Sequence, residues 1–301
     1  MAHYLLTGGT GLIGSALCRH LISANHNVTV LSRQASNVPR LCGSEVNAVS
    51  SLDEIEEQTQ IDAVINLAGA PIADRHWITK RKVILEQSRI GTSSALIDWL
   101  KQRKTKPNCL ISGSAVGWYG NTEDKVVTED SSYHQEYTHQ LCDAWEKQAL
   151  QAQELGVRVC IIRTGLVLSA KGGFLKKMLL PFKIGLGGHL GDGKQYMSWI
   201  HIDDMVKLIL FLIEQQETTG IFNGCSPSPV TNKTFSQTLA KQLNRPAFLP
   251  VPDWLLKSLL GEMSCLLLEG QRVIPEKAQA LGFKFDYTEL NAALADILSS
   301  R

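Results

Sequence analysis

The 301-residue sequence predicts an α/β fold, with a doubly wound parallel sheet and a smaller C-terminal lobe. In the first third of the chain, short apolar runs alternate with longer segments of helical period, as they do in βαβ units. After residue 165 the chain changes to glycine-rich turns and shorter elements, which are typical of a lobe that returns to the sheet only intermittently. We therefore expect a sheet domain over residues 1–165, a mixed segment of lobe and sheet over 166–245, and a helical tail domain over 246–301.

The first βαβ unit is defined by three successive segments. His3–Thr7 is a short apolar run and predicts a strand. Leu12–Ser23 has leucines and alanines at helical spacing, so it predicts a helix with one apolar face. Asn27–Ser32 is rich in β-branched residues and predicts the second strand.

The same alternation continues to residue 164. Apolar runs predict strands, and long segments with helical period predict helices. A break at Gly91 and a cationic end are expected in the first of these helices, because cations suit the negative end of the helix dipole. The expected strands are Ala63–Ala68, Leu110–Ser114 and Arg158–Thr164, and the expected helices are Thr79–Arg103 and Tyr137–Leu155.

The lobe and the tail give weaker signals. The sequence WIHIDD, residues 199–204, predicts the start of a helix with Asp203 or Asp204 as its N-terminal cap. A charge relay between His201 and Asp204 is the alternative. In the tail, which Pro246–Pro252 introduces, apolar patterns predict helices over Trp254–Leu260 and Tyr287–Leu298.

The loop between the first strand and the first helix carries the clearest functional signal. Its sequence, TGGTGLIG, has the glycine spacing of a dinucleotide-binding turn. Glycines there permit a tight turn, close approach of a pyrophosphate and close packing of the helix, whose N-terminus attracts phosphate. The predicted cofactor-binding residues of this loop are Gly8, Thr10, Gly11, Leu12, Ile13 and Gly14.

The end of the second strand favours NADP over NAD as the cofactor. NAD-binding chains usually place a carboxylate there to accept a hydrogen bond from the ribose 2′-hydroxyl. This chain has Ser32 and Arg33 instead. A guanidinium binds a 2′-phosphate, which a carboxylate would repel. The alternative is that Arg33 is a solvated residue at a strand end.

Composition excludes several classes of protein. Lys and Arg number 30 against 29 Asp and Glu, so the chain lacks the field that attracts nucleic acid or anionic membranes. The longest apolar run, 208–213, is too short to span a bilayer, and the N-terminus lacks the basic region of a signal peptide. We expect a cytoplasmic protein with a small-molecule substrate. Seven cysteines without a CxxC pair argue against disulfides and metal sites.

Further motifs resemble the short-chain dehydrogenase/reductase superfamily in its extended and atypical branches, which implies a Rossmann-type fold. They are TGGTGLIG (7–14), NLAG (66–69), SGS (112–114) with WYG (118–120), RTGLV (163–167) and WIHIDD (199–204). A narrower set resembles the NAD(P)-dependent epimerase/dehydratase-like proteins of the YfcH-type epimerase family, which carry a C-terminal domain of unknown function. That set is LPF (180–182), GLGG (185–188), WIH (199–201) and LEGQRVIP (268–275).

The resemblance implies where a cofactor would lie. Leu67, Ala68 and Gly69 match the segment beside the adenosine, and Val167 matches the segment that passes the nicotinamide. Arg89 falls where the helix of the family passes the cofactor, although a solvent-facing arginine is the alternative. The glycine-rich segment 185–194, with the Gln195, Tyr196 and Trp199 that follow it, is the expected wall of the substrate site, unless its glycines are plain turns.

The catalytic pair of the superfamily is missing. Its reductases and epimerases use a Tyr four residues before a Lys, whose ammonium lowers the pKa of the phenol. When Glu146 is aligned with the glutamate that commonly follows the motif, those two positions hold Thr138 and Cys142. We expect Ser114 to hydrogen-bond the substrate and Tyr119 to act as a substitute acid/base. Alternatively, Ser114 caps its strand and Tyr119 packs under the loop.

The sequence therefore predicts an NADP-dependent oxidoreductase or epimerase-like enzyme that acts on a small carbonyl or hydroxyl compound, such as a sugar derivative. The alternative is an NADPH-binding sensor or regulatory protein without turnover, because the Tyr–Lys pair is absent. A structural module with an empty fold is the third interpretation. The chain is expected to be a monomer or a homodimer.

Overall fold

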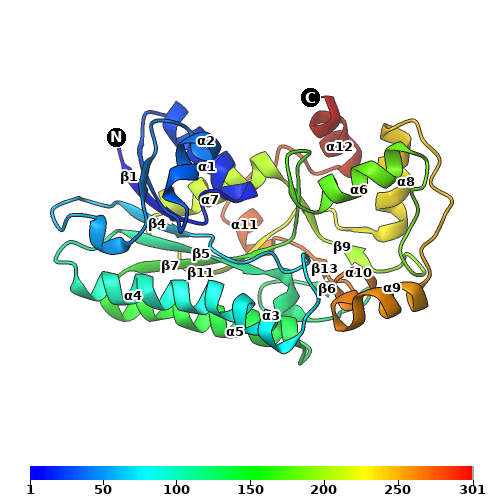
Figure 1. The fold of residues 1–301 in the computed structure, drawn as a ribbon, viewed down its shortest axis with the longest axis horizontal. Helices are drawn as coiled ribbons and strands as arrows, with labels where there is room; N and C mark the ends of the chain where they lie inside the picture. Colours follow the sequence, from blue (N-terminus) through cyan, green and yellow to red (C-terminus); the bar gives the residue numbers. More distant parts are fainter. Residues whose placement is uncertain (300–301) are drawn as a thin grey trace.

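The structure is a computed structural model that describes residues 1–299. Its centre is a parallel sheet of seven strands in the order β11-β7-β5-β4-β1-β2-β3 (Figure 1). The chain begins in the middle of this sheet and builds outward first to one side and then to the other, so the predicted doubly wound fold is confirmed. The strands are β1 His3–Thr7, β2 Asn27–Leu31, β3 Asn47–Val49, β4 Ala63–Asn66, β5 Cys109–Ala115, β7 Arg158–Thr164 and β11 Gly220–Gly224.

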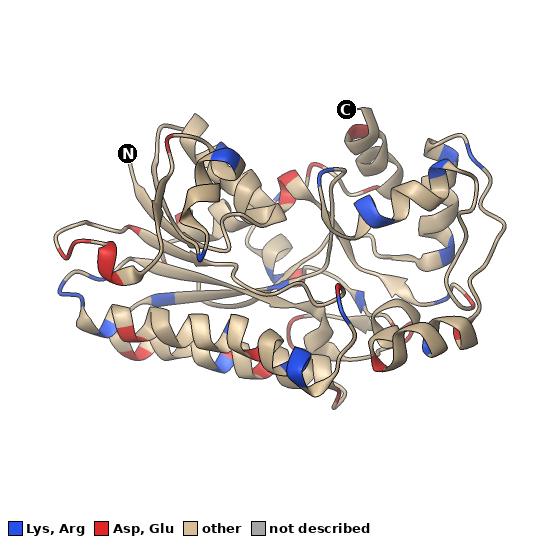
Figure 2. Cartoon of the chain, in the orientation of Figure 1, with Lys and Arg blue, Asp and Glu red and all other residues tan. Residues whose placement is uncertain are grey.

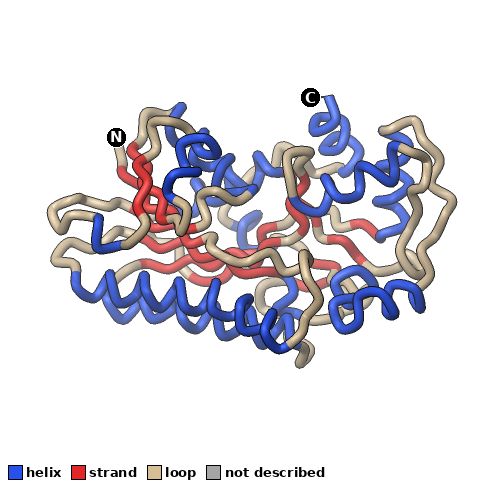
Figure 3. Tube along the Cα trace, viewed as in Figure 1, coloured by secondary structure: helices blue, strands red, loops and turns tan. Residues whose placement is uncertain are grey.

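Helices cover both faces of the sheet. Figures 1 and 3 show α4 and α5 side by side along one face, and α1, α2 and α7 on the other. On the first face α3 leads into α4. The bounds are α1 Leu12–Ser23, α2 Val38–Cys42, α3 Thr79–Glu86, α4 Thr92–Gln102, α5 Tyr137–Leu150 and α7 Ile202–Glu214.

Successive residues of the central strands enter different cores. Leu5 of β1 and Val64 of β4 pack with the α4 side of the sheet. Their neighbours Leu6 and Ile65 pack with α1 and α7 on the opposite side. Because side chains alternate along a strand, a sheet covered on both faces needs apolar residues at every position. This explains the unbroken apolar runs in the sequence.

The remaining elements form a lobe beyond the carboxyl ends of the strands. Short strand pairs join β8 to β10, β9 to β12 and β13 to β6, so the lobe mixes segments from distant parts of the chain. Its elements are β6 Val126–Val127, β8 Leu166–Leu168, α6 Gly173–Lys183, β9 Tyr196–Met197, β10 Trp199–His201, β12 Val230–Thr231, α8 Asn232–Gln242, α9 Asp253–Leu260, α10 Cys265–Leu268, β13 Arg272–Val273 and α12 Leu290–Ser299. The short helix α11 Glu276–Ala280 instead packs through Ala278 into the core of the central sheet. The proposed division at residues 165 and 245 remains a prediction.

Two local expectations are wrong. Gly91 does not break the helix over residues 79–103, because a single wide turn of π-helix, Gln87–Gly91, joins α3 to α4. The cap of α7 is His201, whose Nδ1 accepts a hydrogen bond from the amide of Asp203 at 3.2 Å. The carboxylate of Asp204 instead accepts hydrogen bonds from the amides of residues 286 and 287.

Charges of both signs are interspersed over the helices, as Figure 2 shows, in keeping with the net charge of +1. All seven cysteines are free thiols. Within residues 1–299, no helix combines the length and the apolar character that crossing a membrane requires.

Candidate active site

The loop after β1 is closed by backbone contacts that require glycine. Gly8 has a positive φ of 69°, and a Cβ on it would lie 2.5 Å from the carbonyl oxygen of Leu67. A Cβ on Gly14 would lie 2.4 Å from the carbonyl oxygen of Gly8. Both distances are far below contact, and both neighbours are backbone atoms that have little freedom to move. The two glycines therefore bring the loop, the start of α1 and the end of β4 together.

The N-terminus of α1 is open to a ligand. Its N-cap is Gly11, which is exposed and has no side chain to cap the helix, and the first turn has no acidic residue. The amide groups at Leu12 and Ile13 therefore face the loop without a side-chain cap, at the positive end of the helix dipole. Thr10 is half-buried beside them. This arrangement suits a pyrophosphate.

The loop lies where the order of the strands reverses, the point at which doubly wound sheets form a crevice beyond the carboxyl ends of their strands. β1 pairs with β2 on one side and with β4 on the other. The Thr7 hydroxyl donates to Asn66 Oδ1 at 2.6 Å and accepts from the amide of Ala68 at 3.2 Å. Asn66 in turn donates to the Ser93 hydroxyl at 2.8 Å. These bonds fix residues 67–69 opposite the loop, at the place where doubly wound sheets bind their ligands.

The two predicted 2′-phosphate ligands follow β2. The amide of Ser32 donates to the carbonyl of Val49 at 2.9 Å, and its hydroxyl accepts from the amide of Gln34 at 3.2 Å. Arg33 is exposed, and within the described part of the chain its guanidinium has no hydrogen bond or ion pair. The guanidinium is therefore free to bind an anion at this end of the crevice.

Arg89 lies inside the wide turn between α3 and α4, and it reaches the end of β4. A Cβ on Gly69 would lie 3.1 Å from Arg89 Cζ, so the guanidinium lies directly against this glycine. Arg89 also donates to the carbonyl of Leu85 at 3.2 Å and lies 5.3 Å above the ring of Trp145. Burial lowers its pKa. The structure thus places Arg89 in contact with the predicted cofactor segment.

The far end of the crevice is closed by the start of α6. A Cβ on Gly172 would lie 3.2 Å from the side chain of Leu12. A Cβ on Gly173 would lie 3.1 Å from the side chain of Leu12 and 3.6 Å from the carbonyl oxygen of Val167. Val167 is paired within β8 and is half-buried. The loop, Val167 and the start of α6 therefore form one continuous wall.

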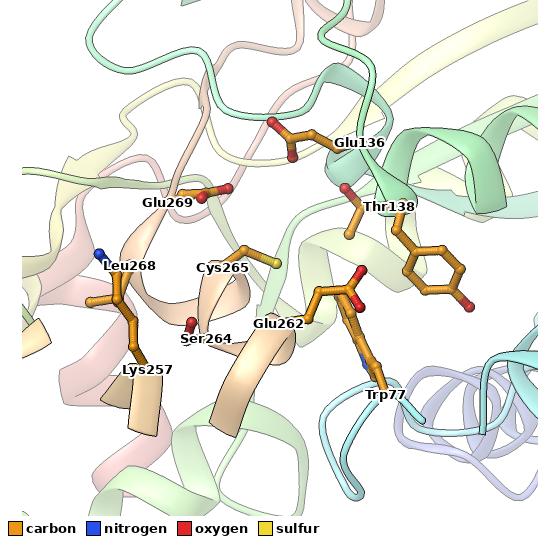
Figure 4. Close-up of a pocket in the computed structure, with 10 residues that line it drawn as sticks. Trp77, Glu136, Thr138, Lys257, Glu262, Ser264, Cys265, Leu268 and Glu269 are labelled. Atoms are coloured by element: carbon orange, nitrogen blue, oxygen red, sulfur yellow. The ribbon is translucent and has the colours of Figure 1, made fainter. Parts of the chain in front are cut away.

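A cavity of about 260 Å³ opens between the sheet and the lobe. The ends of β5 and β7 form its floor, through residues 115–117 and 164–166. Residues 195–198, 266–267 and 269–271 of the lobe form the opposite wall. A second cavity of about 410 Å³ adjoins it, and both are lined by Glu136, Thr138, Cys265 and Glu269 (Figure 4).

Thr138 and Cys142 both line the smaller cavity, which agrees with their alignment to the missing Tyr–Lys pair. Burial raises the pKa of the Cys142 thiol to about 11. The thiol is therefore protonated at neutral pH and cannot supply the positive charge that the missing lysine gives.

The two predicted catalytic residues lie behind the cavity wall. The Ser114 hydroxyl donates to Glu146 Oε1 at 2.6 Å, and Ser114 is 4% exposed. Tyr119 is 0% exposed, its hydroxyl donates to Asn223 Oδ1 at 2.7 Å, and burial raises its pKa to about 12. Neither residue lines either cavity. This geometry favours the alternative in which Tyr119 packs under the loop, and it gives Ser114 a partner other than substrate.

The predicted wall of the substrate site coincides only in part with the lining of the smaller cavity. Leu190, Gln195 and Tyr196 line the smaller cavity, whereas Trp199 is fully buried in the lobe and the glycines at 185–188 lie elsewhere. The segment 266–271 was missed as a wall, although LEGQRVIP was singled out as a motif. No local pattern indicates that this segment folds back to the cavity.

A buried ion pair behind the cavity was also missed. Arg163 Nε and Nη2 donate to the two carboxylate oxygens of Glu146, both at 2.9 Å. The Arg163 guanidinium lies 3.4 Å above the ring of Trp118. Burial acts to lower the pKa of Arg163, but the hydrogen bonds and charge of Glu146 outweigh it and the pKa is raised. The pair holds the end of β7 to α5, directly under the floor of the cavity.

Comparison with known proteins agrees with this geometry. A family model described as the NAD dependent epimerase/dehydratase family matches residues 4–224, and one described as a domain of unknown function, DUF1731, matches residues 251–297. Epimerase family proteins of Staphylococcus aureus strain MRSA252 and Staphylococcus saprophyticus are 39% and 40% identical to this chain, and each comparison covers 99% of this chain and 100% of the relative.

Two solved structures extend the comparison. Human epimerase family protein SDR39U1, isoform 2, solved with NADPH, is 31% identical with a TM-score of 0.87, over 99% of this chain and 100% of that one. A nucleoside-diphosphate sugar epimerase from Corynebacterium glutamicum is 26% identical with a TM-score of 0.76, over 100% of this chain and 59% of that one. Together with the glycine loop and the crevice at the strand reversal, these matches show that the chain belongs to the NAD dependent epimerase/dehydratase family.

Proposed function

We propose that this protein is an NADP-dependent oxidoreductase or epimerase that acts on a small carbonyl or hydroxyl compound. The observation that carries the proposal is the position of the smaller cavity. Its floor is formed by the ends of β5 and β7, and one wall continues through Val167 to the loop after β1. A substrate in this cavity would therefore lie beside the nicotinamide end of a cofactor in the crevice.

Several residues of this chain would hold the cofactor. The backbone from Gly8 to Gly14 would bind the pyrophosphate, and Ser32 and Arg33 the 2′-phosphate. Residues 67–69 would lie beside the adenosine, and Arg89 would reach a phosphate. When bound, the nicotinamide would accept or donate a hydride. The preference for NADP rests on the free Arg33 guanidinium, and the NADPH in the human relative supports it.

Calorimetric titration with NADPH and NADH tests the proposal. We expect NADPH to bind at least about tenfold more tightly than NADH, because an exposed guanidinium hydrogen-bonded to phosphate contributes about 1.5 kcal/mol. Arg33→Ala should remove that preference. Lys104→Ala also removes a positive charge, but it lies before β5, at the amino ends of the strands, and should leave the preference intact. Equal binding of both cofactors, or binding of neither, contradicts the proposal.

A second candidate is an NADPH-binding sensor or regulatory protein without turnover. The position of Tyr119 favours it, because the phenol that could replace the missing Tyr–Lys pair is buried and bonded to Asn223. Such a protein would bind NADPH but exchange no hydride with aldehydes, ketones or sugars. An enzyme should oxidise NADPH with at least one of these compounds, and Thr138→Trp, which blocks the cavity, should abolish that oxidation. A sensor should show no oxidation with any of them.

A further inference from the structure

The two cavities have an unusual charge for a family whose members include a nucleoside-diphosphate sugar epimerase. The charged residues around them are three carboxylates, Glu136, Glu262 and Glu269, and one cation, Lys257. Within residues 1–299, no arginine lines either cavity. A diphosphate or carboxylate entering here would meet a net negative wall.

Two of these carboxylates lie where the cavities meet. Glu136 Oε1 accepts a hydrogen bond from the amide of Asn121 at 2.8 Å, which fixes its direction. The Glu269 carboxylate has no hydrogen bond or ion pair to any described residue. Figure 4 shows both carboxylates turned toward the same part of the cavity, beside Cys265. Burial, and next the charge of Glu136, raise the pKa of Glu269.

The other two charges are already engaged or lie outside this junction. Glu262 forms an ion pair with Lys82 at 2.8 Å and lines only the larger cavity. Lys257, on α9, is exposed and also lines only the larger cavity. Its charge acts on Glu269 from outside by lowering the pKa, which only partly offsets the effects of burial and of Glu136.

Thr138 gives an independent indication that a polar ligand binds here. The residue is 8% exposed and lines both cavities. Its hydroxyl has no hydrogen-bond partner among the described residues, so it is free to bind a ligand in the cavity. Figure 4 shows Thr138 beside Glu136 at the cavity. A ligand with both donors and acceptors would satisfy this hydroxyl and the two carboxylates together.

We propose that Glu136 and Glu269 form a subsite for a cationic group, so that the substrate of this enzyme is a small molecule that carries an amine, held by both carboxylates and the Thr138 hydroxyl. Two half-buried carboxylates without a cation repel each other, and an ammonium between them removes that cost and donates hydrogen bonds to both. The same charges oppose sugar nucleotides and sugar acids. That the bound amine is a substrate rests on the proposed function. The charge preference of the subsite, in contrast, can be measured whether or not the protein is an enzyme.

Ligand-detected NMR titrations with four probes test the subsite, with and without NADPH. Glucosamine, glucose and glucuronate share a sugar ring and differ in charge, and UDP-glucose adds a diphosphate. The pH is set so that the glucosamine amine is protonated. We expect glucosamine to bind about tenfold more tightly than glucose, and glucuronate and UDP-glucose more weakly than glucose.

Glu269→Gln and Glu136→Gln should each reduce the preference for glucosamine to within about twofold. Glu262→Gln is the matched control, because it removes a carboxylate that already has a partner, and it should keep the preference. Tighter binding of glucuronate or UDP-glucose, no binding of glucosamine, or an unchanged preference in Glu269→Gln overturns the subsite. Failure to bind NADPH in the separate calorimetric titration would contradict the proposed reaction. It would not affect the measured preference for glucosamine.

Discussion

Glu146 and Arg163 are joined by two hydrogen bonds in a place that water does not reach, with side-chain exposures of 6% and 1%. A buried charge is tolerated only while its partner is present. Glu146→Gln leaves the guanidinium without its counter-charge and should lower the free energy of unfolding by about 3–5 kcal/mol. Urea unfolding measures this loss. Asp98→Asn breaks an exposed pair with Lys101 and should leave the urea midpoint nearly unchanged.

Tyr119 offers a second measurement on a single group. Tyr119→Phe removes only the hydroxyl that donates to Asn223, so unfolding should become easier by about 1 kcal/mol. NADPH affinity, and turnover of any substrate found, should stay at the wild-type level, because the hydroxyl does not reach the cavity. A loss of turnover of about a hundredfold would instead support the acid/base role predicted from the sequence.

The Glu269 carboxyl should make stability depend on pH. Its pKa is higher in the folded chain than in the unfolded chain, so the folded state binds the proton more tightly. The stabilisation from this proton is complete below the ordinary Glu pKa of about 4 and is lost as pH rises through the folded pKa. Glu269→Gln keeps a neutral side chain. Its stability relative to the wild type should therefore increase as pH rises from about 4 toward 7, as chemical unfolding at several pH values would show.

Among the helices and strands, accuracy of prediction followed the length and locality of the pattern. His3–Thr7 and Leu12–Ser23 have the predicted bounds, because each buries a face whose period is visible in a few residues. β3 and β11 were not predicted. β3 has only three residues, and β11 takes its place from pairing with β7, which lies far away in sequence. Neither strand therefore has a recognisable pattern in its own residues.

The wide turn at residues 87–91 has no sequence signature except Gly91, which normally disfavours a helix. In the structure Gly91 has helical angles, φ −62° and ψ −40°, and a Cβ there would meet only the flexible end of Gln87 at 3.0 Å. Gly91→Ala should therefore stabilise the fold by about 0.5–1 kcal/mol. Thermal unfolding measures this gain. Gly8→Ala, where φ is positive and the neighbour is backbone, should destabilise it.

Among the described residues, ion pairs link the segment 74–82 to α6 and to residues 261–264 of the lobe. Asp74 pairs with Lys177 of α6 at 2.6 Å, and Lys82 of α3 pairs with Glu262 at 2.8 Å. Both are partly exposed, so salt weakens them. Hydrogen exchange of residues 70–78 and 173–183 should become faster at about 1 M salt than at low salt. Asp74→Asn should show the faster exchange already at low salt.

The turn of the glycine loop could be predicted from the sequence because one strand, one loop and one helix form it. That these residues bind the cofactor stays a prediction. The smaller cavity could not be predicted from the sequence. Glu136 precedes α5, whereas Glu269 follows α10. The pairing of β13 with β6 and the hydrogen bonds of Gly270 to residues 121 and 122 bring these regions together. Tyr119 was chosen for its chemistry, but its burial depends on packing against β13 and on Asn223 of β11. Such contacts are set by the assembled fold and leave no local pattern.

The segment 266–271 that closes the cavity is anchored by a residue far away in the sequence. Ser198 donates to the carbonyl of Gln271 at 2.6 Å and accepts from the amide of Val273 at 2.9 Å. On the ribosome, the strands and loop that bind the nucleotide emerge long before this wall, and domains fold in the order of their synthesis. The glycine loop is therefore synthesised early, whereas the cavity is completed only near the end of translation.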